Sequence, residues 1–132
     1  MPLFIDENLS SLIIAVSPDS LPYHSLPVDR VTQPPDTTHD DLQLIDVREP
    51  VEVEIASVDG FVNLPLSEFA NWSGAIHSQF EVDKETVVMC HHGVRSAQMC
   101  MWLAQQGFTN LKNLTGGIDA YSSTVDSSIP RY

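Results

Sequence analysis

The sequence is poor in cysteine and in basic residues. Its 132 residues include two cysteines, too few for a disulfide framework, and no cysteine pair has the spacing of zinc ligands. Six Lys and Arg residues stand against 18 Asp and Glu, so the formal net charge is −12. Because this charge repels polyanions, neither nucleic acid nor an anionic membrane surface is expected as a partner.

Long apolar runs are also missing. The run at residues 12–16 is far too short to cross a membrane, and no charged segment followed by an apolar one opens the chain as a leader would. With thiols expected to be reduced, a cytoplasmic location follows as the default expectation. A hydrophobic content of 42% over this length suits one domain with its own core.

Glycine is absent from residues 1–40, which hold six of the nine prolines. Proline at this density rules out a long helix. We therefore predict a proline-rich, partly irregular arm over residues 1–40, with a short strand possible at 12–16, and a domain over residues 41–132.

Strand-like and helix-like segments alternate from residue 41 onward. Short apolar runs predict strands at 42–47, 61–63, 86–90 and 111–114. Helices are predicted in part of 66–79, with Ser67 a candidate cap, and at 97–106, where an apolar stripe stops at Gly107. This alternation favours an α/β domain built on a parallel sheet.

Cys90 stands where a predicted strand ends and a predicted helix begins. A loop that wraps at this point would aim its backbone N–H groups, and those of the helix start, into one anion-binding bowl. Gly93 would permit the tight turn, and Arg95 would add positive charge. Such a bowl favours the thiolate, which makes Cys90 the candidate nucleophile; the alternative is an ordinary strand-end cysteine.

The loop Cys90-His91-His92-Gly93-Val94-Arg95-Ser96 resembles the active-site loop of the rhodanese-like (thiosulfate sulfurtransferase) family, single-domain type. Four residues separate Cys90 from Arg95, whereas cysteine phosphatases of the related fold have five. Further segments resemble the family's other signatures in the same order: residues 44–50, 60–66, 107–111 and 114–121.

This resemblance implies a three-layer α/β fold in which helices flank a central parallel sheet. It also implies that Cys90 takes sulfane sulfur from thiosulfate or a persulfide and passes it to cyanide or a thiol, without a metal or a cofactor. A sulfur-relay protein is a further candidate partner. The alternative is a non-catalytic rhodanese-homology module for interaction or regulation, and a phosphatase or arsenate reductase is disfavoured by the spacing.

The remaining residues of the loop, 91–96, are expected to form the substrate-binding bowl. Arg95 is assigned to anion binding, with a tie to a carboxylate as the alternative. His91 and His92 are expected to face solvent or shape the entrance rather than act as a base, because neighbours in a tight loop seldom point the same way.

The resemblance implies that Asp46 and Arg48 support the site rather than react, because in the family this motif lies at a strand end near the active-site loop. Arg48 should form an internal ion pair, and Asp46 could lie close enough to act on Arg95. Cys100, inside the predicted helix at 97–106, is expected to be a buried apolar residue, with a thiol that relays sulfur from Cys90 as the minority hypothesis.

Overall fold

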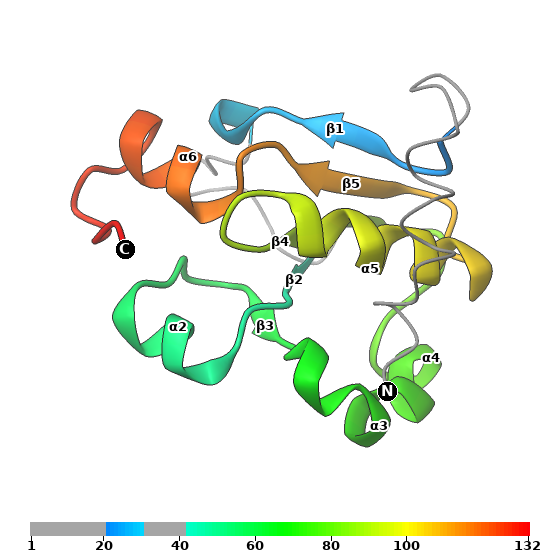
Figure 1. Ribbon diagram of the computed structural model, residues 1–132. Coiled ribbons are helices and arrows are strands. Elements are labelled where there is room, and N and C mark those ends of the chain that lie inside the picture. Colours follow the sequence, from blue (N-terminus) through cyan, green and yellow to red (C-terminus); the bar gives the residue numbers. More distant parts are fainter. Residues whose placement is uncertain (1–20, 31–41) are drawn as a thin grey trace.

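The computed structural model describes residues 21–30 and 42–132. Their strands form one parallel sheet in the order β1-β5-β4-β2-β3 (Figure 1). The strands are β1 (His24–Leu26), β2 (Leu42–Asp46), β3 (Val62–Asn63), β4 (Glu85–Met89) and β5 (Leu111–Leu114). In the central pair, Leu44 lies opposite Val87 and Asp46 opposite Met89. The predicted parallel sheet is confirmed.

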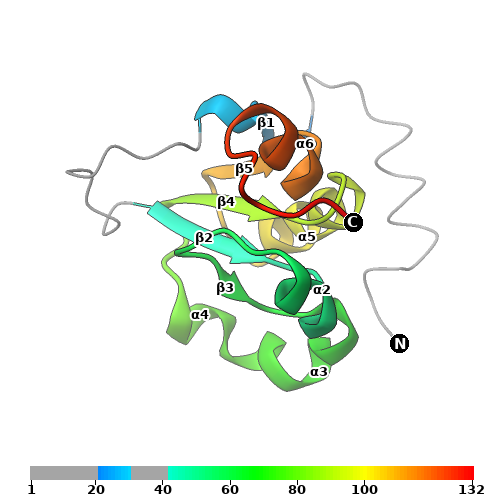
Figure 2. The same cartoon turned by 90° about the vertical axis from the view of Figure 1, so that its left-hand side faces the viewer.

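The helical segments connect these strands. They are the 3-10 turns η3 (Val28–Arg30), η5 (Leu66–Glu68) and η6 (Ser73–Ala75), and the α-helices α2 (Pro50–Ile55), α3 (Phe69–Trp72), α4 (Ile76–Gln79), α5 (Val94–Gln105) and α6 (Gly117–Thr124). Figure 2 shows the helices divided between the two faces of the sheet.

Both faces of the sheet are buried, which explains why β4 reads as a continuous apolar run. Val88 packs into one core cluster, together with Leu103 of α5 and Ile76 of α4. Its neighbours in β4 point to the opposite face and pack with Ile118 of α6. The predicted arrangement of helices around a central sheet is therefore confirmed.

Two aromatic side chains anchor the larger core. Trp72 and Trp102 are both buried, and their rings meet edge to face with centroids 5.9 Å apart. Phe69 contacts each of them in the same geometry. Edge-to-face contacts add to the area that these rings bury, so this cluster fixes the short helices 66–79 against α5.

Part of the segment predicted as an arm belongs to the sheet. β1 lies within residues 1–40 and pairs in parallel with β5, so a domain boundary at residue 41 leaves out an edge strand. Pro22 and Pro27 flank this strand, and proline is tolerated at a sheet edge because no N–H is needed on the open side. The strand considered at residues 12–16 lies outside the described residues.

Two helix starts also differ from the prediction. α5 begins at Val94, three residues before the predicted start, because Gly93 takes a left-handed φ of 105° and turns directly into the helix. Ser67 does not cap the segment at 66–79: Pro65 precedes its first turn, and the Ser67 hydroxyl instead donates to a carboxylate oxygen of Glu49.

A glycine turn joins β5 to α6 and brings the start of α6 into contact with the Cys90 loop. Gly116 and Gly117 both take positive φ, at 77° and 62°. The first N–H groups of α6 then donate to the loop, Ile118 to the Cys90 carbonyl at 2.9 Å and Asp119 to the His91 carbonyl at 3.1 Å. The N–H groups at the start of α6 are therefore satisfied by the carbonyls of the loop that this helix supports.

We expect Gly117→Ala to destabilise the fold by about 2–4 kcal/mol, because it combines a left-handed φ with a steric clash. A Cβ at this position would lie 2.3 Å from the Cys90 carbonyl oxygen and 2.5 Å from that of His91. Gly74→Ala is the control, since a Cβ there meets nothing within 4 Å. Urea unfolding of both variants measures the difference; equal stability would mean that the loop shifts without cost.

Candidate active site

Cys90 lies directly after β4, at the carboxyl edge of the sheet, where sites form in parallel α/β folds. Its side chain is almost fully enclosed, with the residue 1% exposed. The Gly93 N–H donates to Sγ at 3.0 Å, and α5 starts at the next residue. An amide donor and a helix N-terminus both favour negative charge on this sulfur.

A second contact of the Cys90 sulfur involves Ser96, whose Oγ lies 3.3 Å from Sγ. The Ser96 hydroxyl donates to the side-chain oxygen of Asn113, and the Asn113 amide donates to the Gly93 carbonyl at 3.1 Å. Because a hydroxyl has one proton to give, the Cys90 thiol donates to Ser96 in this arrangement. A thiolate would draw the Ser96 proton toward sulfur, at the expense of the bond to Asn113.

Asp46 and Arg48 form the internal ion pair that the sequence predicted for Arg48. Both residues are buried, at 2% and 0% exposure. Arg48 Nε donates to Asp46 Oδ1 at 3.0 Å, and Nη2 donates to Oδ2 at 2.7 Å. The carboxylate of Asp46 is thereby occupied by Arg48, and the carboxylate that meets Arg95 comes from another residue.

The remaining donors of Arg48 fix helix α2 against the end of β2. Nη2 donates to the Ala56 carbonyl at 2.8 Å, and Nη1 donates to the Glu52 carbonyl at 3.3 Å and the Tyr132 hydroxyl at 2.8 Å. One buried guanidinium thus connects a strand, a helix and a segment 84 residues further along the chain.

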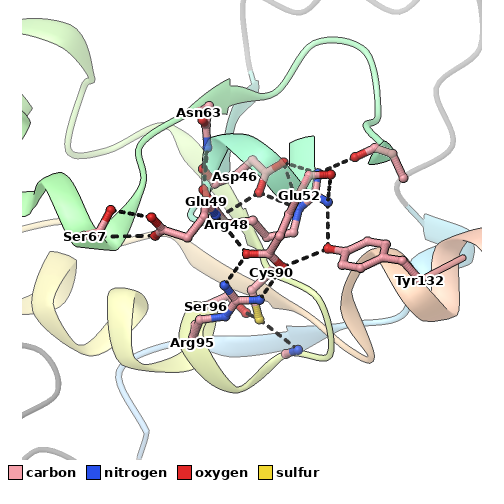
Figure 3. Close-up of polar contacts among 12 residues, drawn as sticks. Asp46, Arg48, Glu49, Glu52, Asn63, Ser67, Cys90, Arg95, Ser96 and Tyr132 are labelled. Carbon is pink, nitrogen blue, oxygen red and sulfur yellow. Dashed lines mark hydrogen bonds and ion pairs between the residues drawn. The ribbon is translucent and has the colours of Figure 1, made fainter. Parts of the chain in front are cut away.

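Glu52 is the carboxylate that meets Arg95 (Figure 3). Arg95 Nη1 donates to Glu52 Oε2 at 2.8 Å, and Nη2 donates to Oε1 at 3.0 Å. Glu52 Oε2 also accepts the Glu49 N–H at 2.9 Å, and Oε1 accepts the Tyr132 hydroxyl at 3.0 Å. The hydrogen bonds from Arg95 lower the pKa of Glu52 to about 2.

The structure therefore has the carboxylate tie that was the alternative role for Arg95. Sequence reasoning missed Glu52, although a signal was present: Glu49-Pro50-x-Glu52 has the spacing of a helix start whose third residue reaches back to the cap. That signal predicts that the Glu52 carboxylate points back toward the start of its helix, but it does not predict that Arg95 lies opposite this carboxylate.

His91 and His92 stand at the rim of the site. The His91 ring lies between those of His92 and Tyr132, with both centroid distances 3.9 Å. Burial lowers the pKa of His91, and the nearby His92 adds to this effect. The stacking of the two rings contradicts the expectation that neighbours in a tight loop point apart. Neither hydrogen bond of the Cys90 sulfur, to Gly93 or to Ser96, involves a histidine, and a role for the histidines at the entrance stays a prediction.

The same histidines form, with Asp119, the group of described side chains whose ligand atoms are close enough to hold a metal ion, all within 4.8 Å. Stacked imidazoles direct their nitrogens side by side rather than toward one point. Asp119 also accepts hydrogen bonds from Arg131, at 3.1 and 3.2 Å. The stacked rings and the bonds from Arg131 both count against a shared ion.

Cys100 is fully buried in the core, as predicted. Burial raises the pKa of the Cys100 thiol far above its ordinary range, so this thiol stays protonated at physiological pH. A protonated, enclosed thiol is a poor nucleophile, which leaves the relay hypothesis without structural support.

The fold and the site define a parallel α/β domain with a cysteine held in an amide-lined loop. The family model of the rhodanese-like domain matches residues 30–124, and the chain belongs to this family. The match starts inside the segment predicted as an arm and covers the whole Cys90 loop.

Known proteins of this family are similar over most of the chain. The chain is 53% identical, over 93 residues, to rhodanese-like/PpiC domain-containing protein 12, chloroplastic, of Arabidopsis thaliana; the match covers 70% of this chain and 31% of that protein. It is 31% identical to the thiosulfate sulfurtransferase GlpE of Shewanella oneidensis, covering 61% of this chain and 75% of GlpE.

A solved structure shows the same architecture. The rhodanese-related protein of Thermoplasma volcanium superposes with a TM-score of 0.59 at 27% identity, covering 78% of this chain and 94% of that one.

Among residues 21–30 and 42–132, no helix is long and apolar enough to cross a membrane.

We expect Arg48→Met to cost about 3–5 kcal/mol of unfolding free energy, because it leaves the buried Asp46 carboxylate without its partner. Arg131→Met is the matched control: its pair with Asp119 lies at the surface, with the arginine side chain 59% exposed, and a much smaller loss is expected. Urea unfolding at pH 7 compares them, and similar losses would contradict the role given to Arg48.

The Glu52–Arg95 pair predicts a pH dependence of stability. The folded-state pKa of Glu52 lies below the ordinary 4.5, so its stabilisation is present above about pH 4.5 and is lost as pH falls toward 2. The stability difference between wild type and Glu52→Gln should therefore be larger at pH 6 than at pH 3, by about 1 kcal/mol after allowance for solvent screening. Glu54→Gln, on the exposed side of α2, controls for charge removal; a difference independent of pH would refute the assignment.

Proposed function

We propose that this chain is a sulfurtransferase that carries sulfane sulfur as a persulfide on Cys90. The observation that carries the proposal is the setting of the Cys90 sulfur, which accepts the Gly93 N–H at the start of α5, at the carboxyl edge of the sheet. Membership of the rhodanese-like family, and the 31% identity to a protein named as a thiosulfate sulfurtransferase, support it.

The reaction has two displacement steps. In the first, the Cys90 thiolate attacks the outer sulfur of the donor; a sulfur–sulfur bond forms, and the donor's own bond to that sulfur breaks with the electron pair leaving on sulfite or a thiolate. In the second, an acceptor attacks the outer persulfide sulfur and regenerates the Cys90 thiolate. Sulfur supplies both the nucleophile and the leaving group, so the proposed steps route nothing through a metal or a cofactor.

The loop's contribution is electrostatic. Negative charge resides on sulfur before, during and after transfer, first on Cys90 and then on the outer persulfide atom. The Gly93 N–H and the start of α5 are fixed around that position, so they need no reorganisation when the charge moves. The other loop residues, His91, His92, Val94 and Ser96, are proposed to set the shape of the bowl.

The donor and the acceptor are proposed by class. Thiosulfate and persulfides are the donors, and cyanide or a thiol is the acceptor. A sulfur-relay protein stays a candidate partner, and the exclusion of nucleic acid and membranes stays a prediction from charge. The cytoplasmic location also stays a prediction, because the Arabidopsis relative is chloroplastic by name.

A non-catalytic interaction module is the second candidate. One observation favours it: Cys90 is 1% exposed, so a donor must displace rim side chains to reach the sulfur. Against it, Cys90, Gly93 and Arg95 are all present, and a module without chemistry has no need of a thiol with an amide donor.

Incubation with thiosulfate or a persulfide should add one sulfur, about 32 Da, to the intact protein, and cyanide should remove it. Cys90→Ser should gain nothing. Cys100→Ala is the matched control, because it removes the other thiol and should load sulfur as wild type does. Loading of folded Cys90→Ser, or loss of loading in folded Cys100→Ala, would overturn Cys90 as the carrier, and no loading of wild type by either donor would favour the interaction module.

A further inference from the structure

Arg95 lies beside the nucleophile, yet its charge is already matched. Its two terminal nitrogens donate to the two carboxylate oxygens of Glu52, at 2.8 and 3.0 Å. The pair is partly enclosed, with the Arg95 side chain 34% exposed and that of Glu52 17% exposed. Parallel two-point contact of this kind is stronger and more directional than a surface ion pair.

Glu52 is also held in place from two other directions. The Glu49 N–H and the Tyr132 hydroxyl donate to its two oxygens, at 2.9 and 3.0 Å. An anionic donor that drew Arg95 away would leave this carboxylate partly buried without its cation. The positive charge of Arg95 is therefore already paired and is not free to bind an anionic donor.

The two arginine–carboxylate pairs beside the sulfur are each electrically neutral. Asp46 and Glu52 provide two negative charges, and Arg48 and Arg95 provide two positive ones, in pairs at 2.7 and 2.8 Å. Burial lowers the pKa of His91, which favours the uncharged ring. A Cys90 thiolate then makes the site net negative, within a chain of net charge −12.

Two exposed aliphatic side chains adjoin this pair in the chain. Val51 and Val94, next to Glu52 and Arg95, are 63% and 69% exposed. An organic group on the donor could bury this surface, whereas the sulfite group of thiosulfate could not.

We propose that Glu52 is a specificity-determining residue that neutralises Arg95 and so selects donors with one negative charge and an organic group, such as alkyl persulfides, over dianionic thiosulfate. This inference rests on the proposed function. It acts on the first displacement step, where the donor's charge meets that of the thiolate, and leaves the identity of the nucleophile unchanged.

Two donors that differ in charge but react in the same way can test this proposal, because in both the leaving group departs through a sulfur atom. Thiosulfate carries two negative charges and transfers its outer sulfur with release of sulfite. Benzenethiosulfonate carries one, and it transfers its outer sulfur with release of benzenesulfinate. In both reactions the Cys90 thiolate becomes a persulfide anion, and the leaving group departs with the electron pair of the broken sulfur–sulfur bond.

The measurement is kcat/KM for each donor, with cyanide as acceptor, in wild type, Glu52→Gln, Glu52→Asp and the control Glu54→Gln. We expect Glu52→Gln to raise the ratio of kcat/KM for thiosulfate to kcat/KM for benzenethiosulfonate about tenfold. Added salt should reduce this increase. Glu52→Asp keeps the charge and should keep a ratio closer to wild type. Glu54→Gln removes a charge without freeing Arg95 and should leave the ratio unchanged.

A second pair of variants covers the case in which Glu52→Gln does not fold. Val94→Lys adds an unmatched positive charge at the exposed rim and should also raise the ratio, whereas Val94→Gln, which is polar and uncharged, should raise it less. An unchanged ratio in folded Glu52→Gln would overturn the role of Glu52. If that variant is unfolded, equal ratios in the two Val94 variants would mean that charge beside the pair does not select donors, and the proposal would fail with it.

Wild type separates this inference from the function it rests on. If wild type forms a cyanide-labile persulfide with either donor but the ratio of kcat/KM values is the same in wild type and in folded Glu52→Gln, only the specificity role fails. If neither donor nor an alkyl persulfide loads folded wild type, the sulfurtransferase proposal fails, and the role of Glu52 as a selector of donors fails with it.

Discussion

The buried ion pair between Asp46 and Arg48 is the interaction on which the rest of the site depends. A guanidinium enclosed this completely is tolerable only when its donors are used, since an unpaired buried charge costs several kcal/mol. Arg48 meets that condition by binding Asp46 on β2 and backbone carbonyls of and after α2. The same bonds hold α2 against the sheet and fix where its first turn presents Glu52.

A second constraint comes from the opposite side of the Cys90 loop. Gly117 lets the start of α6 approach until its N–H groups bind the carbonyls of Cys90 and His91, while Asn113 of β5 binds the Gly93 carbonyl. With loop carbonyls drawn toward α6 and β5, the Gly93 N–H is free to turn inward to the sulfur. The loop is thus shaped by neighbours on two elements that follow it in the chain.

These two constraints meet at Arg95 and Glu52. In the proposed reaction, the loop supplies a dipolar setting for a thiolate or persulfide, whereas the Glu52 carboxylate pairs with Arg95, a positive charge that would otherwise attract a highly charged donor. Stabilising an anionic sulfur and recruiting an anionic substrate are different electrostatic tasks. We propose that in this chain the backbone performs the first task, and that the Glu52–Arg95 pair limits the second.

The sequence by itself determined the parallel α/β fold, the position of the Cys90 loop and the internal pairing of Arg48. The fold and the loop follow from local signals, namely buried apolar strands and a strand-to-helix turn with Gly93, whereas the pairing of Arg48 follows from the family resemblance of residues 44–50. It did not reveal the edge strand β1, whose three residues between prolines carry little pattern and gain their stability from pairing with β5. Only the tertiary structure decided that Arg95 faces Glu52 and that Tyr132 covers His91, because contacts across 43 and 41 positions depend on how the helices pack and leave no periodic trace in the chain.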